Sequence, residues 1–175
     1  MKTETIRPGL CGSTPWRALV VPAATVIAAT ALGTTAQSAP RQAPVTGNVV
    51  FQMMDHEDFG KNERCRHDNP VVNNLGRAPG RFWYFGKCGG EVRAEIHYQL
   101  SRNNDGSIEL RDGEVKLFEG DSADTNDPGG GFPFALSPIK IPQGQTRTMQ
   151  FHVDNVLEDE PDDKADITLT LTNNR

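Results

Sequence analysis

The sequence predicts an all-β fold: an antiparallel β-sandwich of about seven or eight strands with Greek-key or jelly-roll-like connections. Several segments alternate apolar and polar residues with a period of two, turn-forming residues separate them, and no segment shows a helical period. Successive residues of a strand face opposite sides, so each such segment has one face for a core and one for solvent. Short strands with turns between them are typical of sandwiches.

The clearest strand is segment 91–100, in which every second residue is apolar. The turn signal Asn-Asn-Asp-Gly follows at 103–106, because these residues tolerate positive φ. The chain returns through a second alternating segment that begins at Ile108. Its apolar parity shifts by one at Asp-Gly 112–113 and resumes at Val115. This shift predicts a β-bulge.

Other segments follow the same rule. Clear alternation predicts strands around 49–53, 149–153 and 167–171, and weaker patterns predict strands near 70–75, 81–85 and 132–141. The residues expected to face the core include Val92, Ile96, Tyr98, Leu100, Phe151, Val153, Leu169 and Leu171.

Residues 1–36 have the composition of a secretory signal peptide. A positively charged start precedes an apolar run that ends in small residues up to Ala36, which is typical of export signals. The alternative, an uncleaved anchor, is disfavoured by Pro22 and the many alanines and threonines. We therefore expect cleavage after Ala36, a flexible lead-in over 37–45, a β-sandwich domain over 46–175, and a secreted, extracellular protein. No second apolar stretch is long enough to span a bilayer, so no membrane span is expected in the mature chain.

The charge of the chain narrows the range of partners. The whole chain has a formal net charge of −5 at pH 7, and residues 1–36 contain three Lys or Arg residues and one Glu, which leaves −7 for the remainder. This sign disfavours binding to a phosphate backbone, so no nucleic-acid partner is expected. It favours cationic partners such as metal ions, basic peptides or amines. The sequence does not indicate an oligomeric state.

Two cysteines, Cys65 and Cys88, follow the expected cleavage site, whereas Cys11 precedes it. In an oxidising compartment two such cysteines most simply pair. We therefore predict a Cys65–Cys88 disulfide with Cα atoms within about 7 Å. The closed loop of about 24 residues is worth roughly 3 kcal/mol in the loop-entropy model. A metal pair or a catalytic thiol is the alternative, but no Cys–His cluster with zinc spacing accompanies these cysteines.

Four connections are expected at one end of the sandwich if successive strands run antiparallel: 54–63, 87–90, 119–131 and 155–164. Three of the four are strongly acidic. Carboxylates that are brought together repel one another unless solvent or a cation neutralises them. Ca²⁺ accepts about six to eight oxygens in flexible geometry. The sequence therefore predicts an acidic end that binds Ca²⁺, with a solvated acidic surface as the alternative.

The oxygen ligands proposed for this ion come from the acidic connections. They are Asp121, Asp124, Asn126, Asp127, Asp154, Glu158, Asp159, Asp162 and Asp163, with Asp55, Asp58 and the carbonyls of Gly120 and Gly129 as further candidates. The run that starts at Asp124 matches the beginning of an EF-hand loop. Its twelfth position is Ala135 instead of a glutamate, which excludes an EF-hand.

The aromatic residues concentrate in the segment Phe-Trp-Tyr-Phe at 82–85. Alternation sends two of these side chains inward and two outward. The inner pair is expected in the core. The outer pair is predicted to form a flat surface on which a sugar stacks, with Trp83 and Tyr84 as the candidate residues. The alternative is that the outer pair lies beneath a loop.

Three functions remain open. The first is a secreted, non-catalytic binding or interaction module stabilised by Ca²⁺, and the second is a carbohydrate-binding module that uses residues 82–85. The third, and the least favoured, is a small secreted hydrolase or effector, because no nucleophile motif such as Gly-x-Ser-x-Gly is present. A sandwich with acidic loops at one end resembles C2-type and carbohydrate-binding modules. This resemblance is one of composition and layout, and it carries over no residue roles.

Overall fold

The computed structural model describes residues 43–56, 60–156 and 163–175. These residues form nine strands and no helix. The strands are β1 (Val45–Asp55), β2 (Glu63–Asn73), β3 (Gly80–Cys88), β4 (Val92–Arg102), β5 (Ile108–Phe118), β6 (Pro128–Phe134), β7 (Ile139–Ile141), β8 (Thr146–Asp154) and β9 (Lys164–Asn173). The expected signal peptide, residues 1–36, lies outside the described residues.

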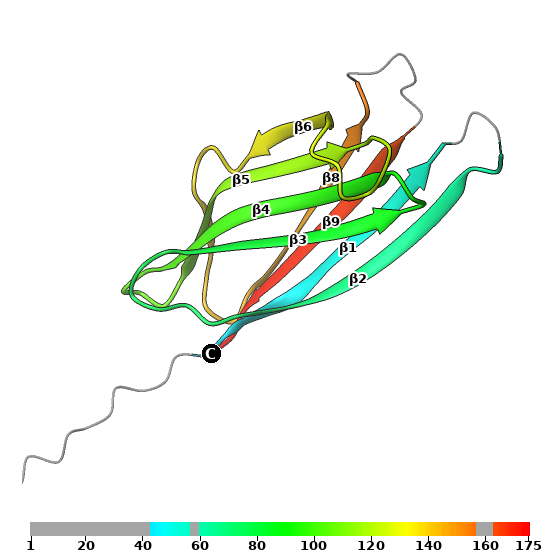
Figure 1. Cartoon of the computed structure of the whole chain (residues 1–175). Helices are drawn as coiled ribbons and strands as arrows, with labels where there is room; N and C mark the ends of the chain where they lie inside the picture. The colour runs from blue at the N-terminus through cyan, green and yellow to red at the C-terminus, as the bar shows by residue number, and fades with distance from the viewer. Residues whose placement is uncertain (1–42, 57–59, 157–162) are drawn as a thin grey trace, which may run out of the picture. The chain divides into compact units, whose positions relative to one another are not determined.

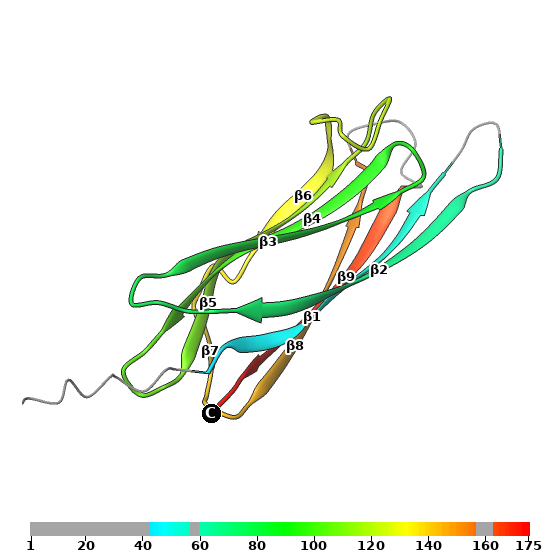
Figure 2. The ribbon, with the colours of Figure 1, turned by 60° about the horizontal axis from the view of Figure 1, so that its bottom comes forward.

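The strands form two antiparallel sheets, which confirms the predicted β-sandwich. One sheet has the order β2-β1-β9-β8, and the other has the order β3-β4-β5-β6, with the short β7 also paired to β5 (Figure 1). Figure 2 shows the two sheets as separate layers. In the described part of the chain, no helix is long and apolar enough to cross a membrane.

The connectivity is up-and-down, which corrects the expectation of Greek-key or jelly-roll connections. Within each sheet, neighbouring strands are consecutive in the chain, except that the first strand pairs with the last and the short β7 pairs with β5. The edge strands β2 and β3 contact each other across one side of the sandwich, and β6 and β8 do so across the other. Apart from β7, the strands therefore follow one another around the sandwich in chain order. Alternation along a strand does not contain this information, because it reports only which face is buried.

Two strand boundaries differ from those expected. β2 begins at Glu63 instead of near residue 70, because its first half lies at a sheet edge and is polar on both faces. The segment expected as one strand at 132–141 is divided into β6 and β7. The division occurs at Ala135, whose φ of 52° takes the chain out of the extended conformation.

The core lies between the inner faces of the two sheets. Seven of the eight residues expected to face the core are buried. The exception is Phe151, which is half-buried because it lies on the edge strand β8, where its ring packs against Phe134 at a centroid distance of 4.3 Å. The predicted bulge is confirmed, since the pairing of β4 with β5 shifts register between His97 and Gln99, opposite residues 112–113.

Candidate functional site

The strand ends that flank four connections lie at the same end of the sandwich, as the sequence predicts: β1–β2, β3–β4, β5–β6 and β8–β9 (Figures 1 and 2). The amide of Val156 donates to the carbonyl of Gly129 over 2.8 Å, and the Asn155 side chain donates to Glu119. The connections after β5 and β8 therefore lie side by side in their described parts. We call this end of the molecule the acidic end.

The proposed Ca²⁺ ligands are only partly brought together. Asp121, Asp124, Asn126 and Asp127 are exposed on the β5–β6 connection. Asp124 forms an ion pair with Lys87, and this hydrogen bond holds the pKa of its carboxyl below the usual range.

Two further proposed ligands also have protein partners. Asp127 accepts a hydrogen bond from the Thr125 hydroxyl over 2.7 Å, and Asp154 lies 2.8 Å from Nε2 of His152. Glu158, Asp159, Asp162 and Asp58 lie outside the described residues. Within the described ranges, no three His, Cys, Asp or Glu side chains converge closely enough to hold a metal ion by themselves.

A row of buried polar side chains crosses the inner face of the first sheet at the acidic end. The Asn155 amide, just beyond the end of β8, donates to the carbonyl of Asp163, just before the start of β9, and Asp55 ends the adjacent strand β1. Their side chains are almost fully buried, and Asp163 accepts a 2.6 Å hydrogen bond from the amide of His56. Carboxylate and amide oxygens are the donors that Ca²⁺ prefers.

The sequence contained a signal for this row. Asp55 and Asp163 each continue the inward-facing parity of an apolar strand, after Met53 and before Ala165. Asp163 is among the ligands predicted from the sequence and Asp55 is a further candidate, both on the ground of the acidic connections and not of this parity.

The second candidate surface is an aromatic row on the outer face of β3 and β4. The rings of Trp83 and Phe85 are stacked with centroids 5.3 Å apart, and Trp83 is also stacked on His97 at 6.1 Å. Trp83 is 57% exposed and Phe85 is 41% exposed. We call these three residues the aromatic row.

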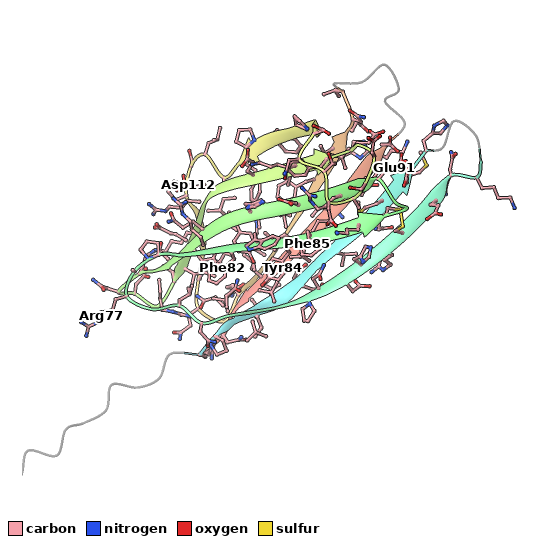
Figure 3. All side chains as sticks on the ribbon, viewed as in Figure 1. Arg77, Phe82, Tyr84, Phe85, Glu91 and Asp112 are labelled. Atoms are coloured by element: carbon pink, nitrogen blue, oxygen red, sulfur yellow. A yellow bond between two sulfur atoms is a disulfide. The ribbon has the colours of Figure 1, made fainter. Side chains whose placement is uncertain are left out.

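Tyr84, which is predicted to share the sugar-stacking surface with Trp83, lies on the opposite face of β3. It points inward from β3, stacks on Tyr98, and donates a 3.1 Å hydrogen bond to the Asn73 side chain (Figure 3). Phe85 is therefore the neighbour of Trp83 on the outer face. The planes of the Trp83 and Phe85 rings differ by 18°, and those of the Trp83 and His97 rings differ by 14°.

A polar network holds the aromatic row in place. The Nε2 atom of His97 lies 2.7 Å from Glu95, and Glu95 accepts a 2.8 Å hydrogen bond from Arg93. The guanidinium of Arg93 packs over the Phe118 ring at 4.3 Å and donates to the carbonyl of Ala123. This chain of contacts joins the aromatic row to the β5–β6 connection, and it orients the His97 ring on which Trp83 stacks.

A groove of about 360 Å³ runs beside the aromatic row, where the edge strands β2 and β3 meet. Its polar lining comes from His67, Asn69 and Lys87, and its apolar lining includes Trp83 and Phe85. Asn69 donates to the carbonyl of Phe85 over 3.4 Å, and His67 bonds to the carbonyl of Lys87. The predicted disulfide is present beside the groove and joins Cys65 to Cys88 with a Cα–Cα distance of 5.4 Å.

The hydrolase alternative requires a deep pocket that joins titratable groups with shifted pKa values. A hollow of about 360 Å³ on β1, β8 and β9 brings titratable groups together. It contains His152, whose pKa is raised by its hydrogen bond to Asp166 and by the nearby Asp154. All three side chains are well exposed to solvent.

Comparisons with known proteins assign no family to this chain. No protein-family model matches it, and no curated protein matches it in sequence. The fold and its surfaces define a two-sheet antiparallel β-sandwich with a disulfide between its sheets, an acidic end and an exposed aromatic row.

Proposed function

We propose that this chain is an exported, non-catalytic binding module that holds a carbohydrate on the outer face of β3 and β4. The observation that carries the proposal is the aromatic row. Trp83 and Phe85 are exposed on it and do not belong to the hydrophobic core between the sheets. Exposed aromatic side chains grouped on one face mark an interaction surface. The network through Glu95 and Arg93 fixes the row before a ligand arrives, which lowers the entropy lost on binding.

The groups around the aromatic row suit a sugar. The apolar face of a pyranose packs against an aromatic ring, and its hydroxyls need a few well-placed donors and acceptors. His67, Asn69 and Lys87 supply such groups in the adjoining groove. We expect one sugar ring to stack on the aromatic row while the next sugar of the same polysaccharide extends into the groove.

Trp83→Ala tests this function directly. We expect the wild-type protein to be retained on at least one insoluble polysaccharide from a panel of cellulose, chitin and xylan. We expect Trp83→Ala to lose at least about tenfold in affinity, because a central aromatic anchor is worth roughly 2 kcal/mol or more. The matched control is Val72→Ala, which removes another exposed apolar side chain (62% exposed) from β2. Retention that Trp83→Ala leaves unchanged, or no retention of the wild type on any member, would contradict the proposal.

Calcium binding at the acidic end is a second proposal, and it is supported by the buried row of Asn155, Asp163 and Asp55. An ion that binds only the folded state stabilises it by about 2.7 kcal/mol at a hundredfold excess over Kd. We therefore expect the melting temperature to rise with millimolar Ca²⁺ and to fall with a chelator. Asp163→Asn should blunt this response, whereas Asp112→Asn, on an exposed bulge position, should keep it. Identical melts with Ca²⁺ and with chelator would leave only a solvated acidic surface.

A further inference from the structure

The four edge strands of the sandwich differ in how well their outer backbones are protected. Unpaired edges are templates for another strand unless they are blocked. On β3, the outward carbonyls of Phe85 and Lys87 accept hydrogen bonds from β2 side chains. β2 carries Pro70 and is charged on its outer face, and β6 carries Pro128 and Pro133, which have no amide donor.

β8 carries Arg147 and His152, but it has no proline, and among the described residues no side chain bonds its outward backbone groups. It runs nine residues without a proline, and in the described part of the chain it pairs only with β9. The amide of Asn155 donates to the carbonyl of Asp163, so the odd-numbered residues of β8 direct their backbone groups toward β9. The even-numbered residues therefore direct theirs outward. Val156, an even-numbered residue just beyond β8, follows the same rule, because its amide donates to the carbonyl of Gly129 and not to β9.

Along most of β8, the amides and carbonyls that point away from β9 have no backbone partner among the described residues. At the acidic end, the carbonyl of Asp154 faces Gly130 of β6 so closely that a Cβ added there would overlap it. Farther along, no backbone partner among the described residues reaches the outward groups of Thr146, Thr148, Gln150 and His152. Four residues of extended backbone are thus available for pairing.

An apolar patch lies beside this open edge. Met149 and Phe151 of β8 are only half-buried, and the ring of Phe151 contacts that of Phe132, which is 38% exposed. Together, a free backbone edge and adjoining apolar side chains form a surface suited to another β-sheet.

We propose that β8 pairs antiparallel with β8 of a second copy of this chain, forming a two-fold symmetric dimer with a continuous eight-stranded sheet. The edge is self-complementary in one register. With the two-fold axis at Met149, Thr146 lies opposite His152 of the second copy and Thr148 lies opposite Gln150. All four open residues then exchange backbone hydrogen bonds, and no like charges lie opposite each other. The same axis places the two Met149 side chains directly opposite each other and Phe151 of each copy opposite Arg147 of the other, so the apolar contact across the axis comes from Met149, with Phe151 on either side of it.

Light scattering on the purified protein, with two edge variants, tests the dimer. We expect the wild type to have the mass of a dimer and Thr148→Pro to have the mass of a monomer with an unchanged circular dichroism spectrum. The Thr148 amide points outward, so proline removes an intermolecular donor without breaking the β8–β9 ladder. Thr148→Ala keeps that donor and should remain dimeric. A wild type that stays monomeric at every accessible concentration overturns the proposal, and this includes the case in which the edge accepts a strand from a different protein.

Cross-linking tests the register without depending on how well Thr148→Pro folds. The two Met149 residues would be a non-hydrogen-bonded pair with Cα atoms about 4.5 Å apart, within the range that a disulfide spans. Met149→Cys should therefore form a covalent dimer on mild oxidation. Arg147→Cys, on the same strand face, should not, because its symmetry mate lies four residues farther along the pair. Equal cross-linking of both variants, or cross-linking of Arg147→Cys alone, overturns the register.

Discussion

Replacing both cysteines of the disulfide, Cys65→Ser with Cys88→Ser, is expected to lower the free energy of unfolding by about 3 kcal/mol. The bond closes a loop with a sequence separation of 23 residues and joins β2 to β3, which are edge strands of different sheets with no backbone ladder between them. Its loss therefore releases chain entropy in the unfolded state and removes the covalent tie across this side of the sandwich. The melting temperature of a domain of this size should fall by roughly 10 °C.

Urea denaturation of the wild type and the double serine variant measures this effect. Adding a reducing agent should shift the wild type toward the variant and should leave the variant unchanged, which separates loss of the bond from any effect of the serines. Equal urea midpoints for the two proteins would show that the bond does not constrain the fold. Two free thiols in the oxidised wild type would show that it does not form.

Gly89→Ala is expected to cost about 2–5 kcal/mol, whereas the same substitution at the next residue, Gly90→Ala, should be nearly neutral. Gly89 has a φ of 54°, where a side chain costs roughly 1–2 kcal/mol. A Cβ at Gly89 would also overlap the buried carboxylate of Asp55, and overpacking adds about 1–3 kcal/mol. No atom lies within 4 Å of a Cβ placed on Gly90.

Gly89→Ala and Gly90→Ala together test how closely Asp55 packs against the β3–β4 turn. Thermal melts of both, compared with the wild type, give the two free-energy changes on one protein background. Equal destabilisation by the two alanines would indicate that turn entropy dominates and that the Asp55 carboxylate moves aside. A stable Gly89→Ala protein would contradict the close packing of the turn on Asp55.

The aromatic segment shows what the alternation of side chains along a strand can predict by itself. A period of two states that two of the four residues at 82–85 face outward, but it does not state which two. The choice depends on the register with β4, in which Phe82 lies opposite Tyr98 and Trp83 lies opposite His97. That register places Phe82 and Tyr84 on the core side. The candidate Trp83 was therefore found from sequence, and its partner Phe85 was not.

Strand β2 shows a second limit of prediction from the sequence. The half of β2 that contributes Val71 to the core has an apolar pattern and was predicted, but the half from Glu63 to Asn69 was not. An edge strand needs little apolar surface when a disulfide and side-chain hydrogen bonds hold it in place. Composition therefore indicates a loop where the backbone ladder with β1 continues.

The sequence by itself determined the class of fold, most inward-facing residues, the Cys65–Cys88 pairing and the gathering of four connections at one end. These features depend on alternation along single strands and on antiparallel succession, which are local properties of the chain. Only the tertiary structure decided the up-and-down order of the strands, the burial of Asp55 beside Asp163, the aromatic row and the open edge of β8. The physical reason is that backbone hydrogen bonds are the same for any neighbouring strand, so the choice of neighbour comes from long-range packing that no local pattern records.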